Sequence, residues 1–179
     1  MRDLRYWIGF NRVNGIGPAK VRALMDHFGD LESAWSAQPI DLKAAGLDRR
    51  AIESLVAARG SINLDQEVER AHKAGAQIIV WDDADYPPLL RGLPDSPPVL
   101  YIKGKLVPAD REWTVAMVGT RKATAYGRQA AETLASELAR NGITIVSGLA
   151  RGIDVVAHEA ALKAGGRTLG VLACGIDQV

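Results

Sequence analysis

The sequence has almost no cysteine, little surplus charge and no long apolar run. Cys174 is the only cysteine among 179 residues, which rules out an internal disulfide and fits a reducing compartment. The net charge of +1 gives the protein no overall electrostatic field that would attract a polyanion. Any nucleic-acid site must therefore be a local basic patch. No stretch approaches the roughly 20 apolar residues of a membrane span. We expect no signal peptide, because residues 1–5 open no long apolar run. We therefore expect a soluble, cytoplasmic protein.

Standard nucleotide and metal signatures are also missing. The sequence has no G-x-x-x-x-G-K-[ST] loop, which argues against a P-loop NTPase. It has no G-x-G-x-x-G after the first parallel strand, and Ser147 stands where a dinucleotide site would place an acidic residue. Four potential ligands lack the paired spacing of a zinc site: Asp154, His158, Cys174 and Asp177. We therefore expect no cofactor and no metal.

Hydrolytic chemistry is likewise disfavoured. Ser147, Asp154 and His158 are the residue types of a catalytic triad, and Asp154 and His158 share one helix face. The nucleophile elbow G-x-S-x-G is absent, however. We interpret Asp154 and His158 as a local helix contact that orients a loop.

Residues 1–62 are predicted to form a small helical domain. The i, i+3, i+4, i+7 spacing of one buried helix stripe is shown by Val21, Leu24, Met25 and Phe28. Gly15-Ile16-Gly17 before Pro18 resembles the turn of a helix-hairpin-helix, which offers amides to DNA phosphate. We favour a turn that serves only packing, because Lys20 and Arg22 alone make a thin basic patch.

Residues 63–179 are predicted to form the second domain, of the α/β class. Apolar strands at 114–118, 143–146 and 168–173 alternate with helices at about 128–140 and 154–164. This βαβαβ order predicts a parallel sheet covered on both faces. Right-handed crossovers then place the three loops that follow the strands at one edge. Since such sheets normally continue, we expect this domain to be incomplete at its C-terminus.

The three loops at this edge each carry glycine. They span 119–127, 147–154 and 174–177, and the first two also carry Arg or Lys among small residues. Glycine lets backbone approach a ligand, Arg121 offers a planar fork for phosphate, and a helix N-terminus follows. We interpret the loops as a site for a nucleic-acid backbone, the alternative being plain turns with solvated charges.

Several motifs together resemble the bacterial DNA-processing protein A family, also called DprA or Smf. The resemblance covers roughly residues 85–179 and rests on Gly119-Thr120-Arg121 with Tyr126-Gly127, Ser147 to Asp154 with Ala157-His158, Gly165 to Thr168, Cys174 to Asp177, Tyr86-Pro87 and Pro97 to Tyr101. The N-terminal helices resemble, more loosely, that family's sterile-alpha-motif-like domain. Thr120 departs mildly from the family's common Ser.

The resemblance implies an extended Rossmann-like domain that binds single-stranded DNA without catalysis. It implies protection of incoming DNA in natural transformation, loading of the RecA recombinase and, at full length, a homodimer. The DNA-binding residues it implies are Gly119, Thr120, Arg121, Lys122, Ser147, Gly148, Arg151, Gly152, Lys163 and Arg167. One alternative is a nucleotide-processing enzyme similar to the nucleoside-monophosphate phosphoribohydrolases, and another is a structural module with a protein partner.

Overall fold

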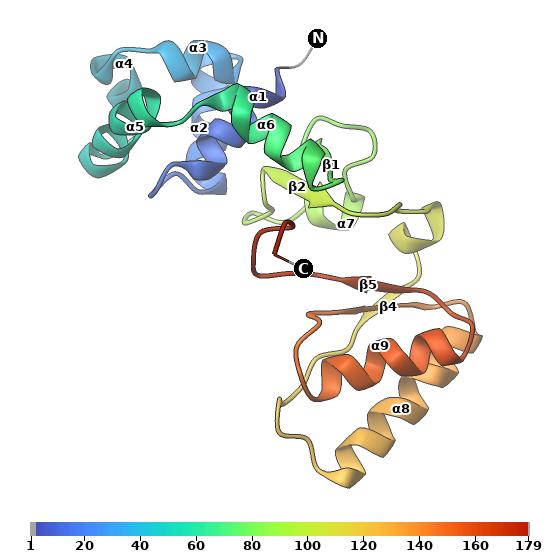
Figure 1. The fold of residues 1–179 in the computed structure, drawn as a ribbon. Helices are drawn as coiled ribbons and strands as arrows, with labels where there is room; N and C mark the ends of the chain where they lie inside the picture. Colours follow the sequence, from blue (N-terminus) through green and yellow to red (C-terminus); the bar gives the residue numbers. More distant parts are fainter. Residues whose placement is uncertain (1–2, 179) are drawn as a thin grey trace. The chain divides into compact units, whose positions relative to one another are not determined.

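The computed structural model describes residues 3–178, apart from the side chains of Ala109 and Arg111. It divides between Gly104 and Lys105 into two compact units, whose elements are labelled in Figure 1. In the described part of the chain, every helix is too short or too polar to cross a bilayer.

The first unit begins with six helices. They are α1 (Leu4–Arg12), α2 (Pro18–Phe28), α3 (Leu31–Ser36), α4 (Pro39–Ala44), α5 (Arg49–Ser61) and α6 (Leu64–Lys73). Four of them begin with an Asp or Asn whose side chain accepts a hydrogen bond from a first-turn amide: Asp3, Asp30, Asp48 and Asn63. These caps explain why so many short helices begin where they do.

Two strands complete the core of this unit. β1 (Gln77–Val80) and β2 (Val99–Ile102) pair antiparallel, and the short α7 (Pro88–Arg91) lies between them in sequence. Ile78 and Val99 belong to the same buried cluster as Phe10 and Leu55 from the helices. The structure thus groups residues 63–104 with the helices, whereas the sequence-based boundary lay after residue 62. The assignment of 63–179 to one DNA-binding domain stays a prediction.

The second unit is a parallel βαβαβ fold, as predicted. After a 3-10 turn (Pro108–Arg111) come β3 (Thr114–Ala116), α8 (Ala125–Arg140), β4 (Thr144–Ser147), α9 (Ile153–Lys163) and β5 (Thr168–Gly170). The sheet order is β3-β4-β5, with Val115 beside Ile145 and Ile145 beside Thr168.

Both helices of this unit lie on the same face of the sheet (Figure 1). Ile145 of β4 is buried with alanines of α8 and α9, whose small side chains let the two helices pack closely. The expectation of helices on both faces is wrong for residues 105–178, where the structure describes no further α-helix. Successive right-handed crossovers that advance in one direction place every helix on one side.

Candidate nucleic-acid interface

The three loops predicted to gather do follow adjacent strands. Residues 117–124 follow β3, residues 148–152 follow β4 and residues 171–178 follow β5. The ladder continues just beyond the assigned strands, because the Met117 amide donates to Val146 and the Val171 amide donates to Ser147. All three loops therefore leave the carboxyl edge of the sheet, where open α/β sheets bind ligands.

Direct backbone contact joins the first two loops. Gly152 has φ +95°, and a Cβ added there would lie 2.2 Å from the Thr120 carbonyl oxygen and 2.7 Å from the Arg121 Cα. The Ile153 amide donates to the Thr120 carbonyl at 3.3 Å. A Cβ at Gly119 would meet the Ile153 side chain at 2.6 Å. Glycine at 119 and 152 is thus what lets the loops touch.

Three cationic residues lie on these first two loops. Arg121 and Lys122 in the first loop and Arg151 in the second are exposed. None of the three forms a salt bridge with another residue that the structure describes. Arg151 also immediately precedes Gly152, the N-cap of α9, where no side chain caps the helix. Unpaired cations beside an uncapped helix N-terminus suit an anion such as phosphate.

Ser147 is buried behind this surface, and Gly148 is exposed next to it. The Ser147 side chain is 2% exposed, and its hydroxyl donates to the Met117 carbonyl at 2.6 Å. The Gly148 amide donates to the buried Asp154 carboxylate at 3.2 Å. These two predicted binding residues therefore hold the loop in place through intramolecular hydrogen bonds.

His158 of α9 is buried against β5. It is 6% exposed, and its Nδ1 lies 2.5 Å from the Thr168 hydroxyl. That hydroxyl donates to the Ile145 carbonyl, so Nδ1 carries the proton and donates to it. Burial lowers the pKa of His158, although Asp154 and the Ser147 backbone oppose that shift. With the Ser147 hydroxyl committed elsewhere, the three form no hydrogen-bonded triad.

Lys163 and Arg167 lie at the opposite, amino edge of the sheet. Lys163 ends α9 and Arg167 directly precedes β5. The Arg167 guanidinium binds both oxygens of Asp110, at 2.6 and 2.7 Å. Burial would raise the pKa of Asp110, but hydrogen bonds from Arg167, the Val107 amide and Thr144 together lower it. The structure thus does not bring Lys163 and Arg167 to the first-loop cations.

Two informative residues were not singled out from the sequence. Asp110 lies 57 residues before its partner Arg167, and no local pattern links them. Leu149 lies between Gly148 and Ala150, where one large apolar residue in a small-residue loop was the available signal. Among the described residues, no group of three or more His, Cys, Asp or Glu is placed to hold a metal ion.

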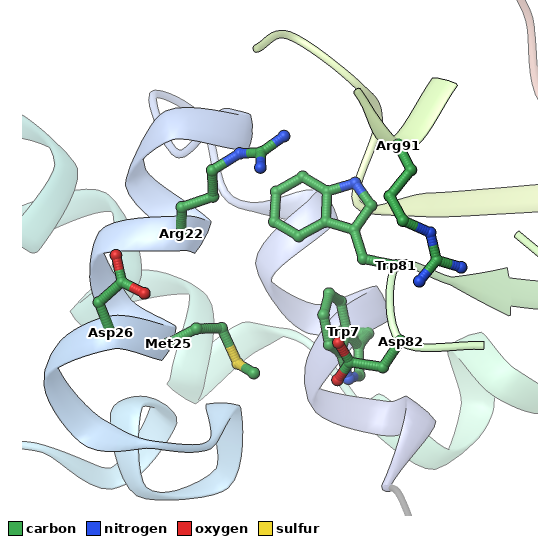
Figure 2. A pocket seen from close by; sticks show the side chains of 7 residues that line it. All are labelled: Trp7, Arg22, Met25, Asp26, Trp81, Asp82 and Arg91. Atoms are coloured by element: carbon green, nitrogen blue, oxygen red, sulfur yellow. The ribbon is translucent and has the colours of Figure 1, made fainter. Parts of the chain in front are cut away.

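The first unit has a separate hollow of about 530 Å³ (Figure 2). It is lined by Trp7, Arg22, Met25, Asp26, Trp81, Asp82 and Arg91. The Arg22 guanidinium lies 4.4 Å from the Trp81 ring centroid and donates to the Leu93 carbonyl and the Ser96 hydroxyl, each at 3.0 Å. Two carboxylates balance the two guanidiniums, so this hollow offers phosphate no net positive field.

Comparison with known proteins matches residues 77–179 to the family model of DNA recombination-mediator protein A. Protein Smf of Synechocystis is 39% identical over 178 residues, which cover 97% of this chain and 45% of that protein. The X-ray structure of DNA processing protein A from Streptococcus pneumoniae superposes with a TM-score of 0.76 at 27% identity, covering all of this chain and 61% of the other.

A second solved structure concerns the single-stranded DNA binding mode of DNA processing protein A from Helicobacter pylori. It has a TM-score of 0.50 at 37% identity and covers 59% of this chain and 47% of that one. The chain thus spans less than half the length of the Synechocystis relative. The mixed α/β fold predicted from the sequence agrees with that of the Streptococcus pneumoniae protein.

Proposed function

The chain belongs to the DNA recombination-mediator protein A family, and we propose that it binds single-stranded DNA at the carboxyl edge of its parallel sheet. The observation that carries this proposal is the contact of the first two loops at Gly152. That contact sets Arg121 and Lys122 beside the loop that holds Arg151, and gives one exposed, unpaired basic surface. The Helicobacter pylori relative, described as binding single-stranded DNA, supports this ligand.

The phosphate backbone is the part of the ligand that these residues recognise. The Arg121 guanidinium pairs with phosphate oxygens through its planar fork, while Lys122 and Arg151 add charge. The dipole of α9 favours an anion near its N-terminus, while the Ile153 and Val155 amides already donate to Thr120 and Ala150. Such contacts give affinity that tolerates any sequence and falls with salt. Gly119, Thr120, Ser147, Gly148 and Gly152 shape the surface, and Lys163 and Arg167 lie outside it.

The wider role of the full-length protein is also a proposal. We infer recombination mediation in natural transformation, with protection of incoming DNA in the cytoplasm, contact with RecA and a homodimer. Family membership supports this role. The same membership makes catalysis, including the phosphoribohydrolase-like alternative, the less supported reading. Contact with RecA and dimerisation rest on the resemblance alone.

Fluorescence anisotropy of a labelled oligo-thymidine tests the DNA site. We expect the 179-residue chain to bind, and Arg121→Ala to weaken binding at least about tenfold, or about 1.4 kcal/mol. The slope of log affinity against log salt should fall by about 0.7 for one lost phosphate contact. Arg140→Ala is the matched control, because this exposed arginine ends α8 at the opposite edge and pairs with Glu137.

Two outcomes would overturn the proposed site. The first is wild-type protein that fails to bind the oligonucleotide at low salt. The second is equal loss in Arg121→Ala and Arg140→Ala, since binding would then follow net charge and not the loop.

A further inference from the structure

Leu149 has an unusual backbone for its residue type. Its φ is +56°, and it is the one non-glycine residue with positive φ in the described part of the chain. The left-handed region strains any side chain with a Cβ, and glycine or asparagine would occupy it with less strain. Strained residues cluster at binding sites, where the surrounding structure maintains them.

The Leu149 side chain is held at the surface. It is 46% exposed and rests on Gly170 of β5, where an added Cβ would lie 2.6 Å from Leu149 Cδ1. Gly170 therefore leaves room for the isobutyl group at the carboxyl edge. The leucine is too exposed to gain much free energy from core packing, but its contact with Gly170 fixes its position. This arrangement presents one apolar group outward.

The surroundings of this group identify its ligand class. Leu149 lies two residues before Arg151, in the loop that touches Arg121 through Gly152. A ligand at these loops is therefore both anionic and in reach of an apolar side chain. Single-stranded DNA has both properties, since its phosphates are charged and the faces of its unpaired bases are apolar. In a duplex the bases are stacked inside, so a duplex offers the cations its phosphates but offers Leu149 no base face.

We propose that Leu149 contacts a nucleobase of bound single-stranded DNA and so distinguishes single strands from duplexes. This inference rests on the proposed function and assigns the two contacts to different residues. Arg121 and Arg151 bind the backbone, and Leu149 binds the base. Burying the exposed isobutyl group against a base face supplies the apolar part of the affinity.

The test compares oligo-thymidine with an abasic strand of the same length and charge. We expect wild-type protein to bind oligo-thymidine at least fivefold more tightly than the abasic strand. In Leu149→Asn the affinity for oligo-thymidine should fall to near the abasic level, while abasic binding changes less than twofold. The thermal midpoint of Leu149→Asn should stay equal or rise, because asparagine tolerates positive φ. Leu162→Asn, at a 62% exposed leucine of α9, should leave the preference unchanged.

Three results would contradict this inference. Equal wild-type affinity for the two strands would remove the base contact while leaving DNA binding at the loops intact. Equal weakening of both strands by Leu149→Asn would show that Leu149 positions the loop and touches no base. Failure of the wild type to bind either strand would overturn the proposed function itself.

Discussion

Gly152→Ala should destabilise the second unit through backbone contact. At φ +95° and ψ −127°, a conformation sparsely populated by any residue but glycine, a residue with a Cβ is strained by about 1–3 kcal/mol. The added Cβ would also meet the Thr120 carbonyl oxygen at 2.2 Å and the Arg121 Cα at 2.7 Å. These are backbone atoms that cannot rotate away, so overpacking adds about 1–3 kcal/mol. We expect a loss of about 2–6 kcal/mol in the free energy of unfolding.

Gly165→Ala is the matched control for this substitution. Gly165 also has positive φ, +77°, but a Cβ added there meets nothing within 4 Å. It therefore carries only the conformational strain, about 1 kcal/mol after the gain from a stiffer unfolded chain. Urea unfolding followed by circular dichroism measures both variants, and hydrogen exchange in peptides from residues 141–170 assigns the loss to the second unit.

The difference between the two variants reports the contact of the loops together with the backbone strain at Gly152, whose ψ of −127° lies outside the left-handed region. If Gly152→Ala is no less stable than Gly165→Ala, the loops do not touch as described. The reasoning that places Arg121 beside Arg151 would then be wrong as well. If the difference appears, Gly152→Ala should also weaken oligo-thymidine binding, since its Cβ pushes the first loop away.

Two further predictions concern buried polar groups of the second unit. Arg167→Met leaves Asp110, whose side chain is 2% exposed, without its guanidinium partner. Urea unfolding should show a loss of about 1.5–3 kcal/mol with unchanged oligo-thymidine affinity, and weakened affinity would bring Arg167 back into the site. The lowered pKa of His158 means that the unfolded chain takes up a proton near pH 6.5, whereas the folded chain takes it up only at lower pH. Stability should therefore fall from about pH 7 to pH 5.5 and do so less in His158→Asn; a flat wild-type profile would contradict a buried neutral imidazole.

The elements of the second unit were predictable because their signals are local. Continuous apolar strands that alternate with helices predicted parallel βαβαβ order, which is confirmed. Which face the helices cover was not predictable, because strand order and crossover direction leave no local pattern. In the first unit, β1 and β2 also carry a local signal, since each is largely an apolar run. Their packing into the helical core joins segments distant in sequence, which local patterns do not predict.

The residues of the candidate site were likewise predictable only in part. The cations Arg121, Lys122 and Arg151 could be selected from the sequence, since each lies in a small-residue loop after a strand. Lys163 and Arg167 were selected by resemblance, and their spatial position separates them from the others. Arg167 in particular is held by Asp110, a partner that only the folded chain brings within reach.

The sequence by itself thus determined the kinds and order of elements and the loops that carry charge. Hydrophobic periodicity and glycine placement are properties of a few neighbouring residues, and they survive without knowledge of the chain's path. The tertiary structure alone decided that Gly152 abuts Arg121, that Arg167 is held by Asp110 and that Leu149 stands exposed on Gly170. Each of these depends on atoms far apart along the chain, whose meeting follows from how strands and crossovers pack.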